Sequence, residues 1–459
     1  MSEKCETCGQ TVDITCKDVE LLYSHHIKDR MEREMSILND AIQMKSVSPL
    51  MAAAGIEKRN NALRTIKDSL LSNKDAIFSA NKEDLDRAAT DGVAEAVVKR
   101  LKFDEHKLSD VCNGIDELIK LPDPLGNITL NRELDSDLFL KRITCPIGVI
   151  GVIFEARPDA LVQISSLCVK SGNCAILKGG KETASTNRVL FTVIKKAVEE
   201  AGLPEGCLFQ AESHAEIDEL LKCDGYVDLL IPRGSNAFVS YIMNNTKIPV
   251  MGHADGICHI YVDKEADLEL AVNVIIDAKL QYTAVCNAVE TLLINREIAP
   301  KFLPMLKKAF DEKGVTVHGT KEVTDMIGGD TVTEDEFKEY LKPEVSVKLV
   351  SDVNEAVAHI NKYGSHHTDA IITKDDDAAA VFAMMVDSAG VYRNCSTRFA
   401  DGFRYGFGAE VGVSTGKLHA RGPVGLEGLV TYKYLLTGNG NIVGDYASGK
   451  KSFHFKDLD

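Results

Sequence analysis

The sequence has no run of about 18 or more apolar residues, and its first ten residues lack the basic and apolar pattern of a signal peptide. The first absence argues against a transmembrane helix and the second against a secretory leader, so we expect a cytoplasmic protein. Proline is also scarce, with 12 among 459 residues, against 34 glycines. This composition excludes a fibrous or disordered chain.

Positive charge is in short supply. The 53 Lys and Arg residues face 69 Asp and Glu residues, which gives a formal net charge of −16. On average such a field repels nucleic acid and anionic membrane surfaces, so neither is an expected partner. An anionic substrate would need a local cluster of Arg, Lys, His or backbone N–H groups.

What remains is an ordinary globular balance, with 44% hydrophobic residues and a length that suits two or three domains. The 12 cysteines are expected to be thiols, since the predicted compartment is reducing. Cys5, Cys8 and Cys16, followed by His25 and His26, are residue types that bind zinc. Their irregular spacing and the missing second Cys-x-x-C favour a polar extension without metal, so we predict no metal site.

Two segments differ in texture from the rest of the chain. Residues 1–45 are polar and charge-dense, and we interpret them as an N-terminal extension with one helix around residues 19–44. Residues 131–144 predict a pair of strands with a turn near Asp135, and residues 429–436 predict another strand.

Elsewhere short apolar runs alternate with helical patterns. One series covers residues 148–231 and a second covers residues 258–385. Near-continuous apolar strands separated by helices predict parallel sheets with both faces covered. The expected fold class is therefore α/β, with two α/β domains and extra strands.

No Gly-x-Gly-x-x-Gly follows a predicted strand, so the usual dinucleotide fingerprint is absent. Gly234 and Ser235 lie between a strand and a predicted helix at residues 237–244, where free N–H groups could hold a pyrophosphate. A plain turn is the alternative. Lys178 ends another strand before two glycines and Lys181, which suits ribose or phosphate contacts as well as a solvated basic turn.

A reactive cysteine needs access and thiolate character. Cys286 lies between a predicted helix and the strand at residues 291–294, among small residues that would let a substrate approach. Cys395 is its competitor, and a buried structural thiol is the alternative.

Glycine-rich loops carry the remaining candidates. His253 and Asp255 lie in a Gly-flanked loop before a strand, where a turn or capping role is the alternative. Arg398 and Arg421 lie in loops dense in glycine, which are typical of ligand-facing surfaces.

Taken together and in this order, these stretches resemble the gamma-glutamyl phosphate reductase family of the aldehyde dehydrogenase superfamily. The resemblance runs from about Pro49 to Asp459. It rests on long strings: Ile153-Phe154-Glu155-Ala156-Arg157-Pro158-Asp159, Pro232-Arg233-Gly234-Ser235-Asn236, Gly252-His253-Ala254-Asp255-Gly256, Cys286-Asn287-Ala288, His366-His367-Thr368-Asp369, Ser396-Thr397-Arg398-Phe399 and His419-Ala420-Arg421-Gly422-Pro423-Val424-Gly425.

The resemblance implies an aldehyde-dehydrogenase-like subunit in three parts. A Rossmann-type NADP-binding domain would comprise residues 46–128 and 146–252, and an α/β catalytic domain residues 253–424. Residues 129–145 and 425–459 would form a β arm that joins subunits, so a homo-oligomer is expected.

The resemblance also implies roles for single residues. Cys286 would be the nucleophile. Lys178 would contact the adenosine ribose of NADPH, Lys181 its 2′-phosphate, Gly234 and Ser235 its pyrophosphate, and Glu339 its nicotinamide ribose. Four further candidates rest on side-chain chemistry and not on the resemblance. The planar guanidinium groups of Arg398 and Arg421 suit the substrate's carboxylate or phosphate, His253 is a candidate for the phosphate, and Asp255 could hold the ammonium.

Two departures from the superfamily pattern bear on the chemistry. The loop at residues 252–256 has no glutamate to activate water, so a thioester on Cys286 would escape hydrolysis. Ala156 stands where the superfamily has an oxyanion asparagine. The Cys286 backbone N–H is one expected donor, and the second donor stays unassigned.

The implied reaction is NADPH-dependent reduction of L-glutamyl 5-phosphate to L-glutamate 5-semialdehyde and phosphate, the second step of proline biosynthesis from glutamate. A separate glutamate 5-kinase would supply the substrate and is a possible functional partner. The alternative is another acyl-phosphate or acyl-CoA-linked aldehyde dehydrogenase.

Overall fold

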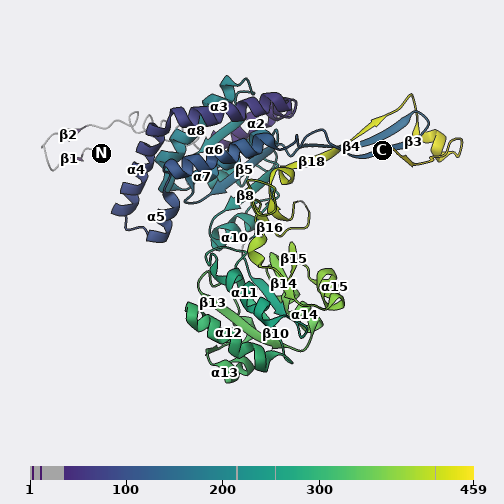
Figure 1. The fold of residues 1–459 in the computed structure, drawn as a ribbon. Helices are drawn as coiled ribbons and strands as arrows, with labels where there is room; N and C mark the ends of the chain where they lie inside the picture. Colours follow the sequence, from purple (N-terminus) through teal and green to yellow (C-terminus); the bar gives the residue numbers. More distant parts are fainter. Residues whose placement is uncertain are drawn as a thin grey trace.

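The computed structural model describes residues 3–4, 11–12, 36–212, 215–253, 255–418 and 420–458. The described chain forms two α/β bodies and a β arm that projects from the first of them (Figure 1). Two short strands, β1 (Glu3–Lys4) and β2 (Thr11–Val12), pair with each other. The predicted mixed α/β fold with parallel sheets is confirmed. The possible zinc ligands Cys5, Cys8, Cys16, His25 and His26 lie outside the described residues.

The first body is built on a parallel sheet of order β7-β6-β5-β8. Its strands are β5 (Val149–Phe154), β6 (Cys174–Gly179), β7 (Leu208–Ala211) and β8 (Leu229–Arg233). Every residue of β5 is buried, as its unbroken apolar sequence requires of a strand covered on both faces. The helices of this body are α2 (Ser36–Ala52), α3 (Ile56–Ser72), α4 (Lys74–Thr90), α5 (Glu95–Leu101), α6 (Glu105–Lys120), α7 (Pro158–Lys170), η1 (Lys181–Thr183), α8 (Ala184–Glu200), α9 (Ala215–Leu220) and α10 (Asn236–Asn244).

Helix α2 corrects the sequence prediction. A helix was expected to end at residue 44, but α2 continues to Ala52 and contains Pro49. Its side chains at Ile37, Ala41 and Met44 are buried in the same core as β5 and β6. Burial of this face outweighs the local cost of proline, so residues 36–45 belong to the first body rather than to an extension.

The second body contains a seven-stranded parallel sheet of order β12-β11-β13-β10-β9-β14-β15. Its strands are β9 (Cys258–Val262), β10 (Val289–Asn295), β11 (Thr316–Gly319), β12 (Asp330–Thr331), β13 (Glu344–Val350), β14 (Thr368–Ile372) and β15 (Gly390–Arg393). Its helices are α11 (Leu268–Leu280), α12 (Ala299–Lys313), α13 (Lys321–Ile327), η2 (Glu334–Glu336), α14 (Val353–Tyr363), α15 (Asp376–Met385) and η3 (Thr397–Phe399). The short strands β11, β12 and β15 carry too little apolar sequence to have been predicted.

Alternation along the strands divides the core of the second body. Ile260 and Val262 of β9 pack in one cluster with α11 and α12, whereas Tyr261 packs in the other with α14 and α15. Successive side chains of a strand point to opposite faces, so this sheet is covered on both sides. A pair of short strands, β16 (Gly412–Ser414) and β17 (Gly422–Val424), and the turn η4 (Leu426–Leu429) follow it in the chain.

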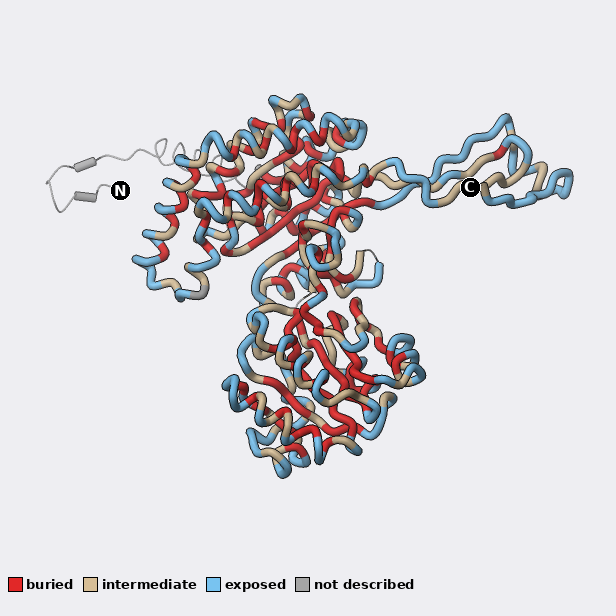
Figure 2. The backbone as a smooth tube through the Cα atoms, viewed as in Figure 1, coloured by how far each residue is buried: buried red, intermediate tan, exposed pale blue. Residues whose placement is uncertain are grey.

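The arm is an antiparallel sheet of order β18-β4-β3-β19. It pairs β3 (Ile128–Asp135) and β4 (Leu138–Pro146) with β18 (Val430–Thr437) and β19 (Lys456–Asp457), and α16 (Val443–Ala447) lies between the last two. The predicted hairpin near residue 135 is confirmed, with Asp137 in the left-handed region at its turn. All of β18 except its first residue is exposed (Figure 2).

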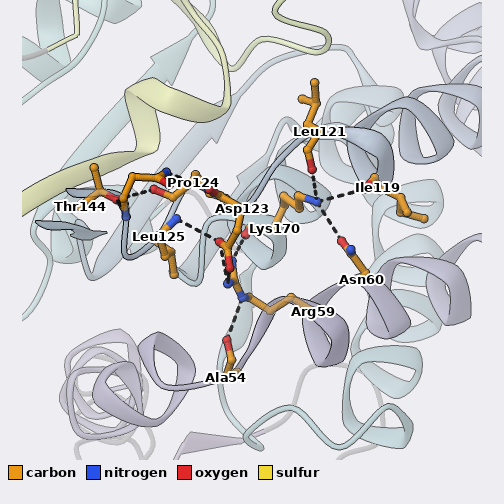
Figure 3. Close-up of polar contacts among 11 residues, drawn as sticks. Ala54, Arg59, Asn60, Ile119, Leu121, Asp123, Pro124, Leu125, Thr144 and Lys170 are labelled. Atoms are coloured by element: carbon orange, nitrogen blue, oxygen red, sulfur yellow. Dashed lines mark hydrogen bonds and ion pairs between the residues drawn. The ribbon is translucent and has the colours of Figure 1, made fainter. Parts of the chain in front are cut away.

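Two buried cations connect the base of this arm to the first body (Figure 3). The Arg59 guanidinium donates to both carboxylate oxygens of Asp123, at 2.8 and 2.9 Å. The Lys170 Nζ donates to the carbonyl oxygens of Ile119, at 3.2 Å, and Leu121, at 2.9 Å. Since those carbonyls lie at the end of α6, the two cations hold the segment that leads into β3.

Within the described residues, no helix combines the length and the hydropathy needed to cross a membrane.

Candidate active site

Cys286 lies in the turn between α11 and β10, half-buried and with a free thiol. The backbone of Gly256 passes directly against it. A Cβ atom at Gly256 would stand 2.5 Å from the Cys286 Cβ, closer than real side chains approach. Glycine is therefore required at position 256 to let the loop before β9 support the thiol.

Two histidines lie beside this thiol. The rings of His253 and His367 meet edge to face, with centroids 4.9 Å apart. One ring nitrogen of each histidine and the Cys286 Sγ lie within 4.8 Å of one another. Burial lowers the pKa of His253 below its usual value.

The carbonyl oxygen of Val413 lies 2.8 Å from His253 Nδ1. A carbonyl only accepts hydrogen bonds, so Nδ1 carries the hydrogen and Nε2 keeps its lone pair. Nδ1 of His367 lies 3.0 Å from the Thr368 hydroxyl, while its Nε2 is buried without a hydrogen-bond partner among the described residues. Both histidines thus present an uncommitted nitrogen.

Two guanidinium groups provide positive charge. Arg233, at the end of β8, and Arg398, in η3, both have their pKa lowered by burial, and in each case the neighbouring Cys286 opposes that shift. Arg398 Nε donates to the side-chain oxygen of Gln281 at 2.9 Å. Within the described chain no carboxylate lies within ion-pair distance of either arginine, although Glu410 interacts with Arg233 and Asp401 with Arg398 at longer range.

Hydrogen bonds connect the Cys286 turn to the segment that carries Arg398. The Asn287 side chain donates to the Ala400 carbonyl at 2.8 Å, and the Thr397 hydroxyl donates to the Asn287 carbonyl at 2.7 Å. Asn287 and Thr397 are buried. These two hydrogen bonds therefore join the Cys286 turn to the segment that carries Arg398.

Glu339 connects the loop beside Cys286 to the start of α10 in the first body. One carboxylate oxygen accepts from the Gly256 N–H at 3.1 Å and the other from the Asn236 amide at 2.6 Å. Asn236 begins α10, so Glu339 lies near both the Cys286 loop and the helix where a pyrophosphate was predicted. Lys279 and Glu290 form a fully buried ion pair at 2.6 Å. Glu290 also accepts the Leu341 N–H at 3.3 Å and so supports the segment that follows Glu339.

The other predicted cofactor residues follow the strands of the first sheet. Lys178 is the last residue but one of β6, is 4% exposed and has its pKa lowered by burial. Lys181 is exposed in η1. The Ser235 N–H at the start of α10 already donates to a Glu155 carboxylate oxygen at 3.0 Å, so this carboxylate stands where a phosphate oxygen was predicted.

Three candidates have other partners. Arg421 donates to the Asp387 carboxylate at 3.0 Å and to its carbonyl at 3.2 Å, so its charge is largely matched. Asp255 is exposed and accepts from the Asn236 amide at 2.8 Å. Burial raises the pKa of Cys395, which makes that competing thiol a poor source of thiolate.

Arg233 and His367 were not chosen from the sequence, although both lie in the quoted strings. His367 immediately precedes β14, as Cys286 closely precedes β10 and Gly256 closely precedes β9. These three strands are parallel neighbours, so their amino ends meet at one edge of the sheet. The signal was the position of each residue before an apolar strand, but it has meaning only once the strand order is known.

Comparisons with known proteins agree with this geometry. Residues 38–342 match the family model described as the aldehyde dehydrogenase family. The chain is 56% identical over 420 residues to the gamma-glutamyl phosphate reductase of Acetivibrio thermocellus, which covers 91% of this chain and 97% of that relative. It is 55% identical over 419 residues to the protein of the same name from Pelotomaculum thermopropionicum, covering 91% and 96%. The crystal structure of gamma-glutamyl phosphate reductase from Thermotoga maritima superimposes with a TM-score of 0.86 at 36% identity, covering 88% of this chain and 99% of that one.

Proposed function

Because the chain belongs to the aldehyde dehydrogenase family, and within it to the gamma-glutamyl phosphate reductases, we propose that it reduces L-glutamyl 5-phosphate to L-glutamate 5-semialdehyde. NADPH is the proposed reductant, and the reaction is the second step of proline biosynthesis from glutamate. The observation that carries the proposal is the half-buried Cys286 thiol beside Arg233 and Arg398. Neither guanidinium forms an ion pair with a carboxylate of the described chain. That arrangement suits a substrate with a reactive acyl carbon between anionic groups.

The first step is attack of the Cys286 thiolate on the acyl carbon. Phosphate leaves with the bonding electrons, so the products of this step are a thioester on Cys286 and free phosphate. Arg233 and Arg398, which both interact electrostatically with Cys286, would hold the anionic groups of the substrate. Phosphate is a weakly basic leaving group and needs no strong acid.

The cofactor residues fit a dinucleotide that runs from the first body to Cys286. Lys178 lies near the carboxyl end of β6 and Lys181 begins η1, where they would meet the adenosine ribose and its 2′-phosphate. Gly234 and Ser235 directly precede α10, and a pyrophosphate there would replace the Glu155 carboxylate as acceptor of the Ser235 N–H. Glu339 would hold the nicotinamide ribose beside the Gly256 loop. When bound, NADPH supplies the hydride that reduces the thioester.

The loop at residues 252–256 contains no glutamate that could activate water against that thioester. Its one carboxylate, Asp255, is exposed and already bonded to the Asn236 amide. Ala254, the one residue of this loop outside the described chain, has no carboxylate in its side chain. Among the described residues of the loop, no carboxylate is placed as a base to activate water. The thioester is left to react with hydride, or with phosphate in the reverse direction.

The decisive assay runs the reaction backwards. We expect the protein to oxidise pyrroline-5-carboxylate, the cyclised form of the semialdehyde, with NADP⁺ only when inorganic phosphate is present. Equal rates without phosphate would contradict the acyl-phosphate reaction, and a requirement for coenzyme A would favour the acyl-CoA alternative. Replacing NADP⁺ with NAD⁺ in the same assay tests the cofactor, with slower turnover expected.

The nucleophile is tested by a matched pair of variants. Cys286→Ala should abolish the phosphate-dependent oxidation, because the neighbouring Cys258 thiol has no exposed surface and donates to the Cys286 carbonyl at 3.2 Å. Cys395→Ala removes a half-buried thiol of the same body and should keep most of the activity. Substantial turnover by Cys286→Ala would rule out the thioester.

Two further proposals concern partners. The β arm is proposed to join copies of the chain into a homo-oligomer, since most of β18 is exposed. The substrate would come from a separate glutamate 5-kinase, and activity of a mixture of the two proteins on glutamate and ATP tests that coupling.

A further inference from the structure

Cys286, His253 and His367 form the one group of potential metal ligands of this kind among the described residues. Their ligand atoms lie within 4.8 Å of one another. In tetrahedral zinc sites, bonds of about 2.0–2.3 Å place neighbouring nitrogen and sulfur ligands roughly 3.5 Å apart. The three side chains therefore need to close by only about 1 Å to share a metal ion.

The protonation of the two histidines suits a metal. His253 donates its Nδ1 hydrogen to the Val413 carbonyl, which leaves the Nε2 lone pair free. Metal-binding histidines commonly make this type of contact through their other nitrogen. His367 is fully buried, and its Nε2 has no hydrogen-bond partner in the described chain, a costly state that a metal would relieve.

The chemical class of the metal follows from the donors. One thiolate and two imidazoles are preferred by zinc over magnesium or calcium, which favour oxygen ligands. Cys258 Sγ lies 3.8 Å from His367 Nδ1, but its thiol already donates to the Cys286 carbonyl at 3.2 Å. An ion held by the three proposed ligands would then keep its fourth position open to water or an anion.

Charges around the three ligands partly cancel. Arg233 and Arg398, which both interact with Cys286, act against a cation, whereas Glu339 and Asp255 act in favour of one near His253. The Glu410 carboxylate interacts electrostatically with both Arg233 and His253, so its charge also favours a cation there. The surroundings therefore reduce zinc affinity without excluding zinc, which suits reversible binding rather than a permanent structural ion.

We propose that Zn²⁺ binds reversibly to Cys286, His253 and His367 and thereby blocks the thiol. A sulfur that donates its lone pair to zinc is no longer free to attack an acyl carbon. Binding rests on the geometry alone, while inhibition also rests on the proposed function of Cys286. Zinc is thus an inhibitor at this site and takes no part in the reaction.

The test follows the Cys286 thiol itself, because cysteines at the N-terminus could bind zinc elsewhere. The full-length protein is treated with iodoacetamide with and without ZnCl₂, and alkylation at each cysteine is measured by peptide mass spectrometry. Zinc should slow alkylation of Cys286 by roughly tenfold or more, because a coordinated thiolate is a poor nucleophile towards carbon. MgCl₂ should have no effect, and alkylation of Cys395 serves as the internal control.

Two variants connect the protection to the histidines. His367→Asn and His253→Gln should each lose most of the zinc protection at Cys286, and either suffices if the other fails to fold. Protection that survives in both folded variants would overturn the site, and so would no protection in the native protein. Zinc inhibition of pyrroline-5-carboxylate oxidation is measured in a separate assay. If zinc protects Cys286 but the protein does not oxidise pyrroline-5-carboxylate, the proposed function is contradicted and the metal site is still supported.

Discussion

At the scale of single residues, the two arginines predicted to bind substrate differ in what they already contact. Arg398 is 8% exposed, bonds to the Gln281 amide and lies within the electrostatic reach of Cys286. Arg421 instead forms an ion pair with Asp387, which Lys417 also contacts. A guanidinium that lacks a carboxylate partner is the better receptor for an anion.

We therefore expect Arg398→Lys to raise the KM for phosphate in the oxidative assay by roughly tenfold to a hundredfold, the loss of a strong bidentate contact. Arg233→Lys should act in the same direction. Arg421→Lys is the matched control and should change this KM by less than about threefold. Steady-state kinetics at varied phosphate measure all three, and equal effects of Arg398→Lys and Arg421→Lys would contradict the assignment.

At the scale of elements, the end of α6 depends on a cation from α7. Lys170 has no exposed surface, and its pKa is lowered by burial. Its ammonium nevertheless takes up the last carbonyl groups of α6, at Ile119 and Leu121, just before the chain enters the arm. The neighbouring Arg59–Asp123 pair holds the same segment.

Lys170→Met should lower the free energy of unfolding by about 2–4 kcal/mol, because it leaves two half-buried carbonyl oxygens without this donor. The control is Lys67→Met, which removes the exposed ion pair between Lys67 of α3 and Asp116 of α6. An exposed pair contributes about 0–1 kcal/mol, so this control should stay near the native value. Urea unfolding followed by circular dichroism compares them, and similar losses in both would sink the capping role.

At the scale of the whole molecule, the arm leaves apolar side chains without cover. Tyr432, Tyr434 and Leu436 alternate along β18 and are 53%, 55% and 59% exposed. Alternate residues of a strand share one face, so these three form a single apolar surface, with the two tyrosine rings in contact at 5.7 Å. Such a surface on a projecting arm is typical of a subunit contact.

The double variant Tyr434→Glu with Leu436→Glu should reduce the oligomer to smaller species, because it places charge on that face. Lys433→Glu changes charge on the opposite face of the same strand and should leave the mass unchanged. Light scattering coupled to gel filtration gives the mass of each. A native protein that is already monomeric, or a double variant of native mass, would show that the arm does not join subunits.

Much of the fold was accessible from the sequence because strong periodic patterns survive folding. The second predicted series begins at residue 258, where β9 begins, since the apolar sequence of that strand is unbroken and buried. The helix α2 was predicted to end early, before Pro49. In the fold it continues to Ala52, because burial of Ile37, Ala41, Met44 and Met51 outweighs the local cost of that proline. Strand β15 was missed because an edge strand of four residues leaves little pattern to detect.

By itself, the sequence determined the α/β class, the family and the choice of Cys286, since each depends on strings of neighbouring residues. Only the tertiary structure decided which distant residues surround that thiol. Arg233 ends β8 of the first sheet, whereas His367 and Cys286 precede adjacent strands of the second. Sequence order does not record the strand order β10-β9-β14, and contacts made through that order arise only when the sheet forms.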